Sequence, residues 1–312
     1  MRILFMGTPD FAVASLGALI AAGHEIVGVV CQPDKKQGRK MILTAPPVKQ
    51  YAQEKGLSVY QPQTLKDGAF AQVLGELNPE LIVVVAYGKI LPKYILDYPK
   101  YGCINVHGSI LPKLRGSALI QWAVINGMEQ TGVSIMQLDE GMDTGDVLLV
   151  ETTDIGTNET AEDLFDRLMV LGANALIKAI DNIDKLTPIP QDYTKATHAP
   201  MLKKEMAQID FAKPAIEIHN LIRGMNSWPV AYIPMKKGIL KVYTSAVTEG
   251  KNNTPSGTVI ACDDRLVVQT TKDAIELLQV QLQGKKQMSA QEFLRGNSMA
   301  IGQIINDTEE QR

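Results

Sequence analysis

Cysteine is scarce in this chain of 312 residues, which has three, at Cys31, Cys103 and Cys262. They lie far apart and form no Cys-x-x-Cys pair, so their spacing fits neither a disulfide framework nor a zinc site built on thiolates. We therefore expect a protein of the reducing cytoplasm that holds no metal.

Long apolar runs are also missing, since no stretch is long enough to span a bilayer. The opening MRILFMG lacks a charged leader and a cleavage site of small residues, and is instead typical of a first β-strand. We expect no membrane segment and no export signal. No internal repeat or low-complexity tract is visible either.

An excess of basic charge is absent as well, because 31 Lys and Arg stand against 34 Asp and Glu, for a net charge of −3. This excludes a uniformly basic nucleic-acid binder but leaves room for local patches. Residues 200–300 hold thirteen basic and nine acidic residues, a balance of +4, so the remainder carries −7. Residues 31–45 set four basic residues against Asp34, a balance of +3. Two interpretations of that segment remain: a solvated surface loop, or a loop that binds the phosphates of a nucleic acid.

The length predicts two domains. The first begins as a βαβ unit, with an apolar strand at 3–6, a helix opened by Pro9 and a second strand at 27–30. The run LIVVVA at 81–86 is apolar at every position, as in strands buried on both faces. We predict an α/β fold, a Rossmann-like, doubly wound and mostly parallel sheet. Its further elements are a strand at 103–107, a helix from about 118, a hairpin of 132–138 with 146–152, and a helix at 161–183.

Composition changes near Leu186, where LTPIPQDYTKATHAP carries three prolines and is typical of an extended linker. Beyond a helix at 214–225, five short strands with turn signals predict a small C-terminal β-barrel of the oligonucleotide-binding kind. The expected division is a catalytic domain at 1–189, a linker at 190–206 and the barrel at 207–312.

The first strand is followed by a turn with the single glycine Gly7. A pyrophosphate cradle needs several glycines there, which weakens the hypothesis of a nicotinamide-dependent dehydrogenase.

The densest polar motif is NVHGSILP at 105–112, at the end of a predicted buried strand, where open α/β sheets bind ligands. Alternation along a strand places Asn105 and His107 on the same side. Two such polar groups either serve a ligand or satisfy each other in the core. The other histidines, His24, His198 and His219, have no comparable neighbours.

A second polar cluster is DEGMDTGD at 139–146, between two predicted strands. One interpretation is a turn with solvated carboxylates, and the other places one carboxylate against His107. The spacing does not follow a calcium loop, and no phosphate-binding motif accompanies it for magnesium.

NVHGSILPKLRG and LDEGMDTGDVL, with the opening MRILFMGTPDFAVASL and the stretch QPDKKQGRK, resemble the family of methionyl-tRNA formyltransferases. The resemblance covers both domains. The Asn-x-His-x-Ser-x-x-Pro and Asp-x-x-x-Asp-x-Gly elements belong to a wider group of enzymes that use 10-formyltetrahydrofolate. They therefore indicate the reaction, while the opening segment, the basic loop and the barrel indicate the tRNA acceptor.

The resemblance implies that Asn105, His107 and Asp143 are catalytic. Asn105 and an N–H of His107 would donate to the oxyanion that forms when the methionyl amine attacks the formyl carbon. Asp143 would orient His107 and could take the amine proton, directly or through water. Cys103 then needs no role beyond packing.

The resemblance also assigns binding residues. The folate pocket would be lined by 109–112 and by the backbone of the loop at 87–91, which suits a flat heterocycle. Arg39 would contact the acceptor end of methionyl initiator tRNA. The expected partners are that tRNA and folate, for a cytoplasmic monomer without bound metal. The folate set is Ser109, Ile110, Leu111, Pro112, Gly88, Ile90 and Leu91, and the tRNA set is Lys35, Lys36, Arg39 and Lys40.

Two alternatives stay open. A folate-dependent formyltransferase acting on a small amine, such as an amino sugar nucleotide, would keep the catalytic residues but not the steep salt dependence of a tRNA substrate. An RNA-binding protein without catalysis would use the barrel and the basic loop, while Asn105, His107 and Asp143 would only stabilise the strand end.

Overall fold

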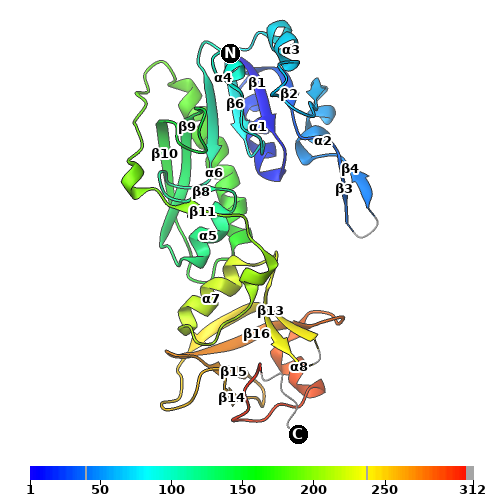
Figure 1. The fold of residues 1–312 in the computed structure, drawn as a ribbon, viewed down its shortest axis with the longest axis vertical. Coiled ribbons are helices and arrows are strands. Elements are labelled where there is room, and N and C mark those ends of the chain that lie inside the picture. Colours follow the sequence, from blue (N-terminus) through cyan, green and yellow to red (C-terminus); the bar gives the residue numbers. More distant parts are fainter. Residues whose placement is uncertain (39–40, 237, 307–312) are drawn as a thin grey trace. The chain divides into compact units, whose positions relative to one another are not determined.

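The computed structural model describes residues 1–38, 41–236 and 238–306 (Figure 1). The chain divides into two compact units. The N-terminal unit comprises Met1–Leu119, Gln130–Asp154 and Phe165–Ala199. The C-terminal unit comprises Ile120–Glu129, Ile155–Leu164 and the chain from Pro200 onward.

A seven-stranded sheet in the order β10-β9-β7-β6-β1-β2-β5 forms the N-terminal unit. The five strands from β7 to β5 in that order are parallel, and β9 and β10 are antiparallel to their neighbours. The predicted Rossmann-like fold is therefore confirmed. The strands are β1 (Arg2–Gly7), β2 (Glu25–Val30), β5 (Val59–Tyr60), β6 (Leu81–Val85), β7 (Cys103–His107), β9 (Gln130–Gln137) and β10 (Val147–Asp154).

Helices cover both faces of this sheet. On one face, α1 and α6 lie side by side, with Phe11 and Phe165 in an edge-to-face contact, and Gly172 lets α6 approach Val106 of β7 closely. On the other face, α3 and α4 supply Phe70 and Ile95 to a core cluster with strand residues of β1 and β6. The helices of this unit are α1 (Asp10–Ala21), α2 (Pro47–Glu54), α3 (Phe70–Leu77), α4 (Lys93–Leu96) and most of α6 (Ala161–Asp181), whereas α5 (Leu119–Ile125) belongs to the C-terminal unit from Ile120 onward.

Strand order reverses direction at β1, because β2 and β5 follow on one side and β6 and β7 on the other. Ligands of such sheets bind beside this switch point, outside the carboxyl ends of the strands. Val84 of β6 is level with Asn105 of β7. The loops that follow β6 and β7 therefore leave neighbouring strands at the same edge of the sheet.

The stretch that the sequence assigns to an extended linker belongs to the N-terminal unit as far as Ala199. It contains the 3-10 turn η1 (Tyr193–Lys195) and the strand β11 (His198–Ala199), which pairs in parallel with β8 (Arg115–Gly116). Ile189 also forms a bridge with Val147. Prolines and polar residues in this stretch prevent a helix, but its backbone forms hydrogen bonds with the segment that follows β7.

The C-terminal unit is a curled antiparallel sheet in the order β12-β13-β16-β15-β14, with β17 paired to β16. This curled half-barrel confirms the predicted small β-domain. Its strands are β12 (Ala231–Met235), β13 (Gly238–Thr248), β14 (Val259–Ala261), β15 (Leu266–Gln269), β16 (Ala274–Leu282) and β17 (Met288–Ser289). Its helical elements are η2 (Lys204–Ala207), α7 (Ala215–Gly224) and α8 (Ala290–Gly296).

Buried polar contacts join α7 to the loop before α6 within this unit. His219 contacts the Ser245 hydroxyl at 3.0 Å and the Thr157 carbonyl at 3.2 Å, and Arg223 donates to the Gly156 and Glu159 carbonyls. His219 therefore has a structural environment. Within the described ranges, no helix is long and apolar enough to cross a membrane.

Candidate active site

His107 ends β7 on the sheet face opposite α6, because its neighbour Val106 points toward Gly172. The imidazole is 4% exposed, and its Nε2 lies 3.2 Å from the Leu114 carbonyl oxygen. A carbonyl only accepts, so Nε2 carries the proton and Nδ1 presents a lone pair. Burial lowers the pKa of His107, and Arg115 lowers it further, while Asp143 and the Leu114 carbonyl oppose that shift. His107 is therefore a neutral imidazole near pH 7.

Asp143 faces the free nitrogen of His107. Its Oδ1 lies 3.7 Å from His107 Nδ1, and its Oδ2 accepts a hydrogen bond of 2.8 Å from the Gly116 backbone N–H. Asp143 adopts a left-handed backbone with φ of 54°, which aspartate tolerates better than most residues. Two residues on, Gly145 has no room for a side chain, since a Cβ would lie 2.0 Å from the Gln137 carbonyl oxygen. The β9–β10 loop thus holds one carboxylate against the histidine.

Asn105 lies two residues before His107 on the same face of β7. Its side chain is half-buried and forms no hydrogen bond with any residue that the structure describes. A half-buried amide without a protein partner has both N–H groups available for a ligand. The sheet pairs its backbone with Met136 of β9 and places it level with Val84 of β6.

The loop after His107 is tied closely to the protein. Ser134 of β9 donates its hydroxyl to the Ser109 carbonyl at 2.8 Å and accepts from the Leu111 N–H at 3.1 Å. Ser109 itself donates to the Lys113 carbonyl at 2.7 Å, and Leu111 packs with Met136 in a small core cluster. Within residues 109–112, Ile110 and Pro112 are half-buried and the other two residues are buried.

The loop after β6 has the opposite character. The backbone groups of Gly88, Ile90 and Leu91 form no hydrogen bonds within the described part of the chain. Gly88 has φ of +81°, Ile90 is 57% exposed, and Leu91 packs into the core. The Tyr87 carbonyl accepts from the Gln32 side chain at 3.0 Å, which fixes the start of this loop. The unpaired N–H and C=O groups of this loop therefore belong to a backbone whose start is held in place.

The basic segment predicted as a loop is partly a hairpin of β3 (Lys35–Gln37) and β4 (Ile42–Thr44). Lys35 and Lys36 are exposed. Asp34, the acidic residue of the segment, pairs with Lys49 at 2.8 Å, and hydrogen bonds from Gln61 and Lys49 lower its pKa. The positive charge of the hairpin is therefore not offset by Asp34. Arg39 and Lys40 lie outside the described residues.

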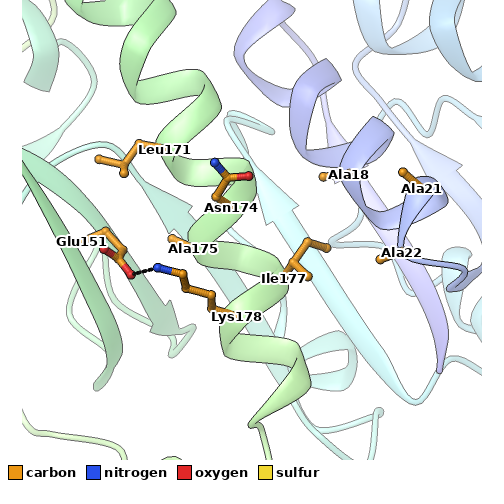
Figure 2. Close-up of a pocket in the computed structure, with 9 residues that line it drawn as sticks. All are labelled: Ala18, Ala21, Ala22, Glu151, Leu171, Asn174, Ala175, Ile177 and Lys178. Atoms are coloured by element: carbon orange, nitrogen blue, oxygen red, sulfur yellow. Dashed lines mark hydrogen bonds and ion pairs between the residues drawn. The ribbon is translucent and has the colours of Figure 1, made fainter.

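Chemistry based on a cysteine thiol or a metal ion has less support. Burial raises the pKa of Cys103 to about 12, so its sulfur is an unreactive thiol near pH 7. Across the described residues, no three His, Cys, Asp or Glu side chains gather as metal ligands. A groove of about 610 Å³ beside α1 and α6 is lined by nine residues, four of them alanines, and its lining includes the Glu151–Lys178 ion pair (Figure 2). It lies on the α6 side of the sheet, away from His107.

The sequence analysis did not predict the residues that hold the loops around His107 and Asp143. Gln191 is buried and contacts the backbone of Asp143, and Arg115 lies over the ring of Tyr193 at 4.7 Å. Thr197 accepts a hydrogen bond from the Leu114 N–H. Arg115 lies within the NVHGSILPKLRG motif, but no periodicity or motif marks Gln191, Tyr193 or Thr197, because they lie in an irregular segment far along the sequence.

Comparisons with known proteins identify the family of the chain. Residues 1–180 match the formyl transferase family and residues 201–298 match the formyl transferase C-terminal domain. The methionyl-tRNA formyltransferase of Caldanaerobacter subterraneus is 46% identical over 308 residues, covering 98% of this chain and 100% of the relative. The enzyme of the same name from Bacillus licheniformis is 44% identical, covering 99% of both chains.

Solved structures share the fold. An N-formyltransferase from Helicobacter canadensis, in complex with folinic acid and dTDP-3-aminofucose, aligns with a TM-score of 0.66 at 19% identity over 89% of this chain and 98% of that one. At that identity the likeness concerns the fold alone. The sequence relatives are far closer, and on their evidence the chain belongs to the methionyl-tRNA formyltransferase family.

Proposed function

We propose that this chain transfers the formyl group of 10-formyltetrahydrofolate to the amino group of methionyl initiator tRNA. The observation that carries the proposal is the site on β7, where the half-buried Asn105 amide has no described protein partner and His107 lies between the Leu114 carbonyl and Asp143. Formyl transfer to an amine needs a donor to a developing oxyanion and a base for the amine proton, and this site offers both.

Asn105 would donate its amide N–H groups to the oxyanion. The role expected for His107 from the sequence, donation of an N–H to the oxyanion, does not fit this pairing, because the Nε2 proton already goes to the Leu114 carbonyl. His107 would instead accept the amine proton on its free Nδ1. The imidazolium so formed would gain Asp143 as a counter-charge at one nitrogen and keep the Leu114 carbonyl at the other. His107 would then return the proton to the departing nitrogen of the donor, so no covalent link to the enzyme is needed.

The loop after β6 fits the formyl donor. The pterin ring of a folate is flat and carries hydrogen-bond donors and acceptors on its edge, and the unpaired backbone groups of Gly88, Ile90 and Leu91 match that chemistry. The donor supplies the formyl group when bound. Ser109, Ile110, Leu111 and Pro112 would form the adjoining wall, with Ser134 fixing its shape.

Two groups of exposed basic residues support a tRNA acceptor. The first is the hairpin with Lys35 and Lys36, and we assign Arg39 and Lys40 to the same role. The second lies where β13 begins and β16 ends. The Gln283 backbone N–H donates to the Ile239 carbonyl at 2.9 Å there, so the turn before β13 and the turn after β16 lie together. Exposed lysines on these turns are Lys236, Lys285 and Lys286.

The domain roles follow from the same proposal: catalysis in residues 1–189, tRNA contact in residues 207–312, and 190–206 between them. The expected cytoplasmic location and monomeric state also remain predictions.

The experiment that tests this assignment is Asn105→Ala. Loss of one preorganised donor to an oxyanion costs about 10²- to 10³-fold in turnover, whereas tRNA binding should be retained because Asn105 makes no phosphate contact in this account. Turnover and tRNA affinity are measured on the same folded preparation. Unchanged turnover would remove Asn105 from the mechanism, and a protein that binds RNA without any turnover, wild type included, would favour the non-catalytic alternative.

A further inference from the structure

Gln191 lies between the last long helix of the N-terminal unit and β11, in a stretch without any motif. Its side chain is 7% exposed although most of its neighbours are exposed. A buried amide must find partners for its donors and its acceptor, so its contacts show what it holds.

All the polar groups of the Gln191 side chain are paired. Nε2 donates to the Asp143 carbonyl at 3.0 Å and to the Gly145 carbonyl at 2.7 Å. Oε1 accepts from Arg115 Nε at 3.2 Å and from its Nη2 at 2.7 Å. One side chain therefore joins the β9–β10 loop to β8, which follows the loop that leaves β7.

The same segment also holds the other neighbour of His107. Thr197 accepts from the Leu114 N–H at 2.8 Å through its hydroxyl, and from the Arg115 N–H at 2.9 Å through its carbonyl. Leu114 in turn accepts from His107 Nε2. Gln191 and Thr197 thus hold, from one short stretch, the two groups that face the two nitrogens of the imidazole.

We propose that Gln191 is a positioning residue that sets the place of the Asp143 carboxylate relative to His107 by binding the backbone carbonyls of Asp143 and Gly145. The proposal rests on the proposed roles of His107 and Asp143. Bonds within the loop do not replace it, because the Asp139 carboxylate accepts hydrogen bonds from Gly141 and Thr144 and, within the described residues, from no other group. The Gly116 N–H orients the carboxylate through Oδ2, and the Tyr193 hydroxyl donates to the Thr144 carbonyl at 3.3 Å. Within the described residues, however, only Gln191 donates to the carbonyls of Asp143 and Gly145.

The test is Gln191→Met, which keeps the volume of the side chain but removes the donors and the acceptor. The matched control is Gln269→Met in the C-terminal unit. Gln269 is also buried, and its Nε2 also donates to two backbone carbonyls, those of Thr270 and Asp273, while its Oε1 accepts from Lys251. Both variants lose the same kind of contacts, so a general loss of stability affects both.

We expect kcat of Gln191→Met to fall by about 10- to 100-fold, because small displacements of catalytic groups cost that much, with the KM for the folate donor unchanged. Gln269→Met should keep kcat within about twofold. The pH profile gives a second readout. Asp143 raises the pKa of His107 against the lowering by burial and Arg115, so a displaced Asp143 moves the acidic limb of kcat/KM to lower pH.

Equal kcat in the two variants, or an acidic limb that does not move, would overturn the role of Gln191. If Gln191→Met does not fold, Gln191→Asn is measured instead, because it keeps the amide but shortens its reach to the carbonyls of Asp143 and Gly145. The same shift of the acidic limb is expected, and an unmoved limb contradicts the proposal. Asp143→Asn in parallel separates the two hypotheses. If Asp143→Asn retains full activity, the proposed mechanism fails; if it loses activity while Gln191→Met behaves like Gln269→Met, only the positioning role fails.

Discussion

At the scale of residues, the site depends on how His107 is paired. Its Nε2 proton is committed to the Leu114 carbonyl, and its Nδ1 faces Asp143 at 3.7 Å, a distance longer than a hydrogen bond. A neutral imidazole gains little from that carboxylate, whereas the imidazolium gains a counter-charge. The arrangement therefore favours the protonated form only as it is produced during the reaction.

The first residue-scale prediction concerns Asp143→Asn. We expect kcat/KM to fall by about 10²- to 10⁴-fold, because the base loses its charge partner. The carboxylate raises the pKa of His107 from a value already lowered by burial, so its loss lowers that pKa further. We expect the acidic limb due to His107 to move to lower pH in Asp143→Asn than in the unsubstituted protein.

Asp146→Asn is the control for this prediction, because Asp146 lies in the same loop and its carboxylate has no hydrogen bond or ion pair within the described residues. The acceptor amine titrates at its own pKa and produces a separate step that both variants share. An acidic limb that moves equally in both variants, or in neither, would contradict the pairing of Asp143 with His107.

The sequence singled out Asn105, His107 and Asp143 as candidates, but it did not predict their surroundings. Alternation along β7 places Asn105 and His107 on one face, because the rule depends only on the strand. The contact between His107 and Leu114 could not be predicted, since it depends on left-handed backbone at Leu114 and on Thr197, 83 residues away. Contacts between irregular segments leave no periodic signal.

At the scale of elements, strands were easier to predict than loops. The apolar run at 81–86 contains β6, which is buried at every position, as parallel strands covered on both faces are. The predicted strand at 103–107 coincides with β7. The hairpin of β3 and β4 was predicted only as a loop, because each strand has three residues. The segment before Pro200 was interpreted as a linker from its prolines, yet β11 pairs with β8.

The hairpin supports an element-scale prediction. Lys35→Ala/Lys36→Ala should weaken tRNA binding about tenfold, with the KM for the folate donor unchanged, because these exposed side chains lie apart from the loops after β6 and β7. The slope of log affinity against log salt should decrease by about two, one for each lost phosphate contact. Arg39→Ala should show the same division between tRNA and folate.

The control pair is Lys55→Ala/Lys66→Ala, which removes the same charge from two other exposed positions of this unit. Filter binding and steady-state kinetics on both double variants provide the comparison. Equal damage to tRNA and folate use, or equal effects of the two pairs, would refute a specific role of the hairpin in binding tRNA.

At the scale of the whole molecule, charge is unevenly divided. The chain carries −3 in total, while residues 200–300 carry +4 from thirteen basic and nine acidic residues. This net charge follows from the sequence. Which basic residues lie together does not, because that depends on the pairing of β13 with β16. A protein that is acidic overall can therefore still present a basic surface to nucleic acid.

This charge division predicts a steep salt dependence. Affinity for methionyl initiator tRNA should fall linearly in log–log form with added salt, with a slope of about −0.7 to −0.9 per phosphate contact. The KM for the folate donor, measured in the same salt series, serves as the internal control. A flat response for the acceptor, together with activity on free amino sugars, would favour a small-amine substrate.

The most direct measurement is formyl transfer from 10-formyltetrahydrofolate to methionyl initiator tRNA, with uncharged tRNA and free methionine as parallel acceptors. We predict a formylated product with the charged tRNA alone. Only this acceptor both brings an amine to the site on β7 and binds the basic surfaces through its tRNA. No transfer to the charged tRNA by a folded protein that binds folate would contradict this prediction.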